Sequence, residues 1–510
     1  MTSRQPATPG PAAEPSPSGV GQFGVLLRST AWISGTRMAV RVLGLVNTAI
    51  VARLLTPSDY GVVALGMAVW ALMAAFTNFD TDAYIVRAKS VSRAEFDAAW
   101  TLNLLTGGLV AALIGLGGPW LAAFLGDQRL VPIFYIIAGV VLMASLKNPA
   151  FLTYNRRQDF SRESLVQVSG KVLSVAVTIY FAFKLESFYA LIIGIAFSYS
   201  WTTLGTYVLW PYLPRINLRD IRDVFHFGVW LTAAKALNTV STKLDAFILQ
   251  KIIGPAAVGL FSVAKETTAM VEEQLMMPVR RAVLPAMARA QDDIAELRRL
   301  YVESLAAVFA VVGPFAVGMG LVASDFVALL LGAQWMEAAP LLQILAINLA
   351  LHLITANYQV VFMSLGQTKQ FFYRSAVFFA LRPTGFISGA LLGGLEGAVW
   401  GALLANSVVR LVELYLVKRL IDLPIGRTIW ACNRSLGALT VMVAAVLGLG
   451  LVLPSAAGEG PAALRLLAQS SLGAVVYTAV HLGLWHWSGK PLGIESRLID
   501  LAKRKLGRDN

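Results

Sequence analysis

The chain alternates between long apolar segments and short polar or basic loops. Each apolar segment runs for roughly 20 residues, the length with which a helix crosses about 30 Å of hydrocarbon. None alternates in the manner of a transmembrane β-strand. Because only helices and closed barrels satisfy their backbone polar groups in lipid, the pattern predicts an all-α polytopic membrane protein with about 14 transmembrane helices. The expected spans are 29–52, 60–79, 97–125, 131–147, 164–183, 187–210, 224–250, 256–278, 300–322, 337–363, 371–393, 396–417, 433–454 and 464–487.

One of these spans, 337–363, carries several polar side chains and is expected to be broken (Asn348, His352, Asn357 and Gln359). The remaining segments give the predicted organisation. A disordered cytoplasmic tail precedes an N-terminal six-helix lobe, and a C-terminal lobe is interrupted by an amphipathic cytoplasmic linker. Two further spans and a basic cytoplasmic tail follow. The boundaries, in that order, are 1–22, 23–215, 216–277, 278–299 (the linker), 300–422, 423–489 and 490–510.

A pattern around the first turn returns 198 positions later. The segment Arg53-Leu54-Leu55-Thr56-Pro57-Ser58-Asp59-Tyr60-Gly61 aligns with Lys251-Ile252-Ile253-Gly254-Pro255-Ala256-Ala257-Val258-Gly259. The offset drifts to 211 when Ser164 is set on Ser375, which places Lys171 on Arg382. Six helices return a chain to its starting side, so the pattern predicts two parallel six-helix repeats with a substrate site between them. Chance similarity between apolar spans is the alternative.

Composition supports the membrane assignment. Hydrophobic residues make up 57% and charged residues 14% of the chain, against about 25% charged in soluble domains. The net charge of +13 reflects basic loops on one side of the membrane and indicates no nucleic acid. Those loops exceed the opposite ones in cations by about five to one, which predicts cytoplasmic termini. With one cysteine, Cys432, and no metal or nucleotide motif, neither a metal site nor an enzyme is expected.

Charged side chains within the spans are the candidate functional residues, since each costs about 2.5–3.5 kcal/mol to insert. The cations are proposed to line a cavity for an anionic head group: Arg37, Arg41, Lys171, Lys235, Lys243 and Arg382. Asp245, which aligns with Asn47 of the first repeat, and Glu272 are candidates for proton or sodium coupling. The alternative for all of them is structural ion pairing or snorkelling to an interface. For Asp245 a salt bridge to Lys243 or Lys235 is favoured.

Three segments resemble the polysaccharide transporter family, the Wzx-type flippases of the multidrug/oligosaccharidyl-lipid/polysaccharide superfamily. They are Ala52-Arg53-Leu54-Leu55-Thr56-Pro57-Ser58-Asp59-Tyr60-Gly61-Val62-Val63-Ala64-Leu65, Phe96-Asp97-Ala98-Ala99-Trp100-Thr101-Leu102-Asn103 and Tyr154-Asn155-Arg156-Arg157-Gln158-Asp159-Phe160. The resemblance covers about residues 25–420 and is closest to the exopolysaccharide and colanic-acid branch. One departure is Asn78-Phe79-Asp80-Thr81-Asp82, which places acids where the family has glycines.

The resemblance implies V-shaped lobes and a flippase that moves undecaprenyl-pyrophosphate-linked oligosaccharide outward across the bacterial inner membrane for exopolysaccharide, O-antigen or capsule synthesis. It also implies contacts with the polymerase and chain-length proteins of that pathway. Two other functions are retained as alternatives. A cation-coupled multidrug exporter of the same superfamily would favour an acidic cavity. A membrane polymerase or glycosyltransferase of the same pathway is the other. Polymerases of this pathway usually carry a large outward loop, which this sequence lacks.

Overall fold

The computed structural model describes residues 19–77, 81, 85, 91–156, 159–218, 236, 239–453 and 459–489. All regular secondary structure in these ranges is helical. Lys235, Asp80, Asp82 and the basic tail at 490–510 lie outside the described residues. So does the predicted N-terminal tail, except for 19–22, which are helical rather than disordered because α1 begins at Gly19.

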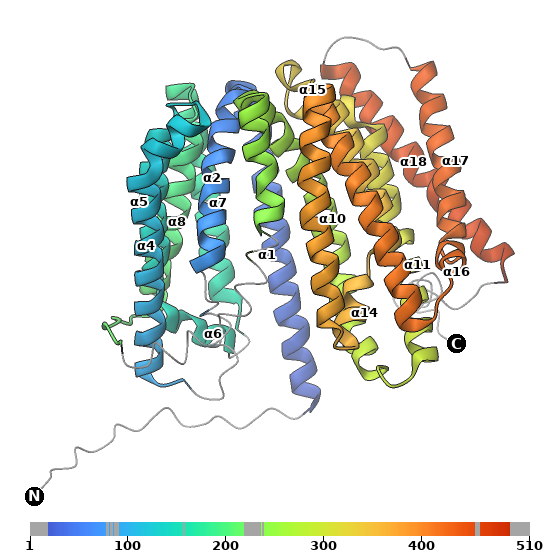
Figure 1. Ribbon diagram of the computed structural model, residues 1–510, viewed down its shortest axis with the longest axis horizontal. Coiled ribbons are helices and arrows are strands. Elements are labelled where there is room, and N and C mark those ends of the chain that lie inside the picture. Colours follow the sequence, from blue (N-terminus) through green and yellow to red (C-terminus); the bar gives the residue numbers. More distant parts are fainter. Residues whose placement is uncertain are drawn as a thin grey trace, which may run out of the picture.

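The N-terminal lobe is a group of long helices, and short connections at 55–56, 126–129 and 186–188 join three pairs of them (Figure 1). Gly126, with φ 76°, ends α4 in the left-handed conformation that glycine adopts most easily. The elements are α1 (Gly19–Leu54), α2 (Pro57–Thr77), α4 (Arg93–Leu125), α5 (Leu130–Ser145), η1 (Pro149–Leu152), α6 (Thr153–Arg156), α7 (Ser161–Leu185) and α8 (Tyr189–Leu209).

The C-terminal lobe begins in the described residues with a helix at 239–252. Gly393 and Gly394 break α15 into two limbs, with Gly394 at φ 59° and ψ −141°, so the chain reverses where two spans were expected. The other elements are α10 (Pro255–Arg289), α11 (Ile294–Leu321), α12 (Ala323–Leu330), η2 (Ala333–Trp335), α13 (Ala338–His352), η3 (Leu353–Thr355), α14 (Tyr358–Ser364), α15 (Thr368–Ile421), α16 (Ile425–Trp430), α17 (Asn433–Val452) and α18 (Glu459–Trp487).

Two expectations about local structure have different outcomes. The expected break in span 337–363 is confirmed. α13 ends at His352, and α14 starts after Asn357, whose amide donates to Ser304 Oγ at 2.9 Å. The separate linker helix expected at 278–299 does not form. Its first part continues α10 to Arg289. Its last part begins α11, which starts after Asp293, whose carboxylate accepts from the first backbone amides of that helix.

The described parts of the chain form a multi-pass membrane fold. Nine of the described helices are long and apolar enough to cross a membrane, the two-limbed α15 counting as one; the number of fourteen spans therefore stays a prediction. The beginning of α1 and the end of α18 lie at the same end of the bundle (Figure 1), which fits an even number of crossings.

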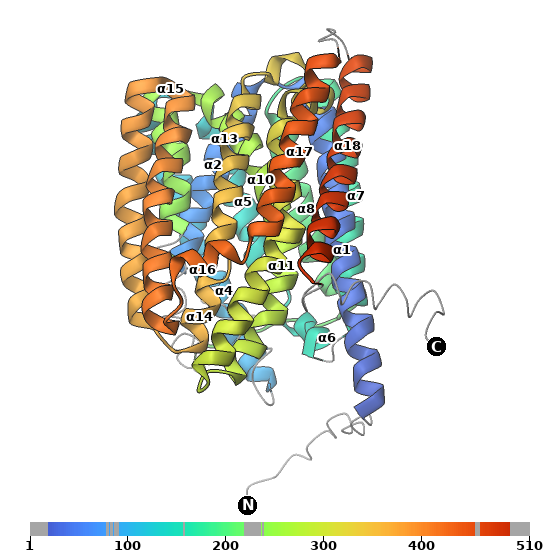
Figure 2. The same ribbon diagram turned by 90° about the vertical axis from the view of Figure 1, so that its right-hand side faces the viewer.

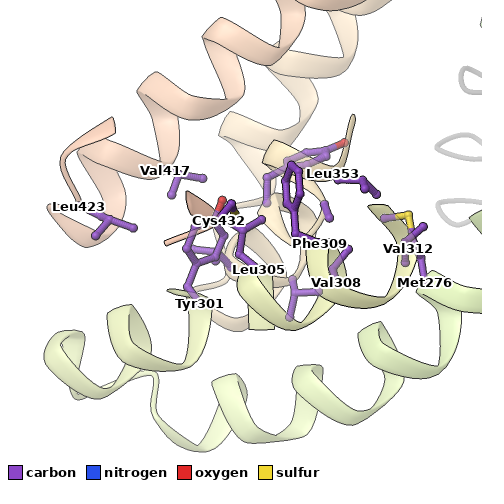
Figure 3. Packing of buried hydrophobic residues seen from close by; sticks show 14 of the residues in the cluster. Met276, Tyr301, Leu305, Val308, Phe309, Val312, Leu353, Val417, Leu423 and Cys432 are labelled. Atoms are coloured by element: carbon purple, nitrogen blue, oxygen red, sulfur yellow. The ribbon is translucent and has the colours of Figure 1, made fainter. Parts of the chain in front are cut away.

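The last two helices, α17 and α18, lie side by side against the C-terminal lobe (Figure 2). Their buried side chains join a core that α11 provides with Leu305, Val308 and Phe309 (Figure 3). The hydroxyl of Tyr477 on α18 donates to the carbonyl of Ala310 at 3.0 Å. These helices therefore extend the C-terminal lobe rather than forming a separate unit.

Candidate functional site

The two lobes meet at one end of the bundle, where the α1–α2 turn and the beginning of α10 lie; we call it the hairpin end. Gly61 and Gly259, which are 198 positions apart, pack reciprocally. A Cβ on Gly61 would lie 1.8 Å from the carbonyl oxygen of Pro255, and one on Gly259 would lie 1.8 Å from that of Pro57. Only glycine permits this approach of α2 and α10. The two predicted repeats thus contact each other through equivalent residues.

Two equivalent cations close the hairpin end from opposite lobes. Arg53 donates from Nη2 to the carbonyl of Leu329 in the C-terminal lobe at 2.6 Å. Lys251, its counterpart in the second repeat, donates from Nζ to the carbonyl of Phe124 in the N-terminal lobe at 2.9 Å. These charges therefore serve contacts between the lobes at this end.

An aromatic pair lies next to this closure. The rings of Tyr60 and Trp335 meet edge to face with centroids 5.0 Å apart. Trp335 Nε1 also donates to the carbonyl of Ala52 at 2.7 Å. Tyr60 lies within electrostatic range of Glu266 of α10, which belongs to a group of charges deeper in the bundle.

Glu266 lies at the centre of that group. It follows the start of α10 by eleven residues, or about 16 Å at 1.5 Å per residue, near mid-bilayer depth. Its side chain is exposed, and it interacts electrostatically with Lys243, Lys171 and Arg41. Among the described residues Glu266 makes no hydrogen bond or ion pair within 4 Å. The carboxylate is therefore surrounded by cations but not in direct contact with them.

Arg41 makes a direct bridge between the lobes. Its guanidinium on α1 forms a hydrogen-bonded ion pair with Glu273 on α10. Both side chains remain partly exposed, at 36% and 53% of their surface. Arg37, one turn earlier on the same face of α1, is exposed and makes no ion pair within the described ranges. Of the predicted arginine pair, Arg41 is thus in an ion pair, whereas Arg37 has none among the residues that the structure describes.

Lys171 reaches this region from α7. Its side chain lies over Gly44 of α1, where an added Cβ would be 3.9 Å from Nζ. Like Lys243 on the helix at 239–252, it is half-buried and has no ion-pair partner in the part of the chain that the structure describes. Of the predicted cations that the structure describes, Lys171, Lys243 and Arg37 are thus the ones with no ion-pair partner in those ranges.

Asp245 and Arg382 belong together in a buried triad. The Asp245 side chain is almost fully buried, and its Oδ2 lies 2.6 Å from Arg382 Nη2 and 3.0 Å from Lys265 Nζ. The expected salt bridge of Asp245 therefore forms, but to Lys265 and Arg382 rather than to Lys243 or Lys235. Lys265 comes from the next helix and Arg382 from a helix 137 residues away, so neither partner is a local neighbour.

Glu272 faces the interior of the C-terminal lobe, away from its chain neighbour Glu273. Its Oε1 lies 3.6 Å from His352 Nε2, which in turn lies 3.3 Å from Arg280 Nη2. Arg410, on the second limb of α15, interacts electrostatically with Glu272 and donates to Asn348 Oδ1 at 2.6 Å. The second coupling candidate is thus part of a network separate from the charges around Glu266.

Sequence reasoning assigned a binding role to the cations but none to the carboxylate at their centre. Glu266 had a signal, since it is an acid within an apolar span, but its position among cations of three helices depends on the tertiary structure. The repeat register marked Arg53 and Lys251 as equivalent without indicating their contacts between lobes. No group of three or more metal-ligating side chains occurs in the described residues.

Comparison with known proteins places the chain among transporter-like folds. Residues 50–340 match a family described as polysaccharide biosynthesis protein. Lipopolysaccharide biosynthesis protein WzxC of Escherichia coli (strain K12) is 23% identical over 320 residues, 62% of this chain and 65% of WzxC, just under two thirds of that relative. Succinoglycan biosynthesis transport protein ExoT of Rhizobium meliloti (strain 1021) is 21% identical over 489 residues, 94% of this chain and 96% of ExoT. The lipid II flippase MurJ, in an inward closed conformation, shares the fold with a TM-score of 0.72 at 13% identity, covering 89% of this chain and 98% of that one.

Proposed function

Because the chain belongs to this polysaccharide biosynthesis family, we propose that it is a flippase for oligosaccharide units linked to undecaprenyl pyrophosphate. The relatives named for lipopolysaccharide synthesis and succinoglycan transport support this proposal, and the fold shared with a lipid II flippase is compatible with it. The observation that carries it is the pair of half-buried cations Lys171 and Lys243. They come from different lobes, interact electrostatically with Glu266 and have no ion-pair partner among the described residues.

The substrate's chemistry matches that pair. A pyrophosphate carries several negative oxygens, and Lys and Arg are the side chains that bind phosphate, as a point charge and as a planar fork respectively. Lys171 lies about 15 Å from the start of α7 at 1.5 Å per residue, so the charge would be held near the bilayer centre. The polyprenyl chain would remain in lipid while the polar glycan occupies water between the lobes.

The proposed orientation follows from the loops. The proposal has the beginning of α1 and the end of α18 on the cytoplasmic side of a bacterial inner membrane, and the excess of cations in the loops of that side supports it. The hairpin end then faces outward, and the Arg53 and Lys251 contacts close the outward side. Alternating access would require these contacts to break while the lobes close at the cytoplasmic end. Proton or sodium coupling and contacts with polymerase or chain-length proteins belong to the same proposal.

Transport of labelled lipid-linked glycan in inverted membrane vesicles tests the function. The Lys171→Ala/Lys243→Ala double variant should reduce the initial rate at least tenfold, since each charged contact to phosphate contributes about 1.5–3 kcal/mol. Lys418→Ala is the matched control, because Lys418 is an exposed cation outside this site and should leave transport unchanged. Equal rates in the double variant and the wild type would refute the role of these cations, and no wild-type transport would refute the function.

A further inference from the structure

The two repeats differ in charge at equivalent positions. In the second repeat Asp245 holds Arg382 in a 2.6 Å ion pair within the buried triad. The residues that align with this pair in the first repeat are Asn47 and Lys171. An amide thus replaces the carboxylate, while the cation is retained. The cation that is paired directly with a carboxylate in the second repeat thus has no direct carboxylate contact within the described residues of the first.

Asn47 is placed to influence Lys171. Nζ of Lys171 would lie 3.9 Å from a Cβ on Gly44, and Asn47 is three residues further along α1, on the same helical face. The Oδ1 atom of Asn47 is buried and has no hydrogen-bond partner within the described structure. Because buried polar atoms in native proteins are nearly always satisfied, this unpaired acceptor means that no described protein donor fixes the orientation of the Asn47 amide. With the amide turned, its Nδ2 group can donate to an anion held by Lys171.

We propose that Asn47 and Lys171 form the part of the site that binds the phosphate groups of the substrate, and that the amide at position 47 sets its preference for anions. The inference rests on the proposed function and deepens it. Lys171 supplies the charge, and Asn47 supplies a neutral hydrogen-bonding group that leaves this charge available. A carboxylate at position 47 would recreate the arrangement of the second repeat and occupy Lys171 internally.

The physical argument predicts an asymmetric mutational response. Asn47→Asp changes the charge at nearly constant shape, so any large effect must come from electrostatics. Asn47→Leu also conserves much of the volume but removes the polar group without adding charge. Replacing the amide by an acid should therefore harm anion binding far more than deleting its polarity.

Binding of undecaprenyl pyrophosphate to the full-length protein in nanodiscs tests the proposal. Asn47→Asp should weaken affinity roughly ten- to a hundredfold, as expected for losing a charged contact, and Asn47→Leu only about threefold. In a Lys171→Met background the additional penalty of Asn47→Asp should shrink, since Lys171 is no longer available to be neutralised. Gly44→Asp provides a second route, because its carboxylate would lie beside the same ammonium group.

The outcomes distinguish a failure of the Asn47 and Lys171 assignment from a failure of the flippase function. If the wild type binds undecaprenyl pyrophosphate and both acidic variants bind it equally well, the assignment of Asn47 and Lys171 is overturned while the flippase function stands. Equal losses in Asn47→Asp and Asn47→Leu would reduce Asn47 to a packing residue and likewise overturn it. If the wild type has no affinity for undecaprenyl pyrophosphate, the proposed function fails together with the inference.

Discussion

Replacing Asp245 by asparagine tests the structural role assigned to the buried triad. The carboxylate is 2% exposed and accepts from Arg382 at 2.6 Å and Lys265 at 3.0 Å. Asparagine keeps the shape but removes the charge, which leaves two cations facing each other in a poorly hydrated site. Breaking a buried ion pair from one side costs about 3–5 kcal/mol. We expect the lower end of that range, because the Lys265 side chain is 35% exposed and can recruit water.

Unfolding of the purified protein by increasing mole fraction of denaturing detergent measures this loss. Asp422→Asn is a suitable control. Asp422 is 94% exposed, pairs with Arg298 at 3.5 Å, and has a positive φ of 49° that asparagine tolerates. Its loss should cost at most about 1 kcal/mol. The double variant Asp245→Asn/Arg382→Gln should recover part of the loss by removing one unpaired cation. If Asp245→Asn unfolds within about 0.5 kcal/mol of the wild type, the triad has no such structural role.

Three further predictions concern other parts of the site and fold. Gly61→Ala and Gly259→Ala should each force the hairpin end apart, because the new Cβ would meet a proline carbonyl. Spin labels on cysteines introduced at Gln128 and Ala333 should then report a longer distance, and an unchanged distance would contradict the packing. The native Cys432 should stay unlabelled, because it is buried and burial raises the pKa of its thiol to about 12. Glu266→Gln should tighten undecaprenyl pyrophosphate binding about two- to fivefold, since it removes a competing exposed charge; weaker binding would show that Glu266 assists the substrate. Burial alone would raise the pKa of Asp127, but hydrogen bonds from Arg129 lower it. Their contribution to stability should therefore be present above about pH 4 and lost as pH falls through the lowered folded-state pKa. The hydrogen-exchange protection factors of the α4–α5 turn, which correct for the intrinsic pH dependence of exchange, should then fall in the wild type but not in Asp127→Asn, and identical profiles would refute the linkage.

Much of the fold could be predicted from sequence because lipid imposes a simple rule on span length. The break after His352 was visible in the polar residues of its span, and the reciprocal contacts of Gly61 and Gly259 follow the register of the repeat. The linker expected at 278–299 failed for a local reason. The polar composition of this segment resembled that of a surface helix. In the structure the segment consists of the end of α10 and the start of α11, which extend beyond the apolar parts of their spans.

The candidate site was less predictable. Sequence identified the charges within spans but could not pair them, because partners such as Asp245 and Arg382 come from distant helices. It therefore gave six cations one common role. The structure divides the described ones into Arg41 and Arg382, which have direct carboxylate partners, and Arg37, Lys171 and Lys243, which have none within the described ranges. That division depends on where helices face each other, which a single sequence does not encode locally.

The central claim is that this protein moves an intact lipid-linked oligosaccharide outward. Its most direct test is the location and structure of that lipid in cells depleted of the protein. The account predicts that complete, unpolymerised units accumulate in the inner leaflet, protected from a membrane-impermeant sugar-oxidising reagent added to the outer side. Complete units that react with the outside reagent, or units with altered glycan structure, would contradict it.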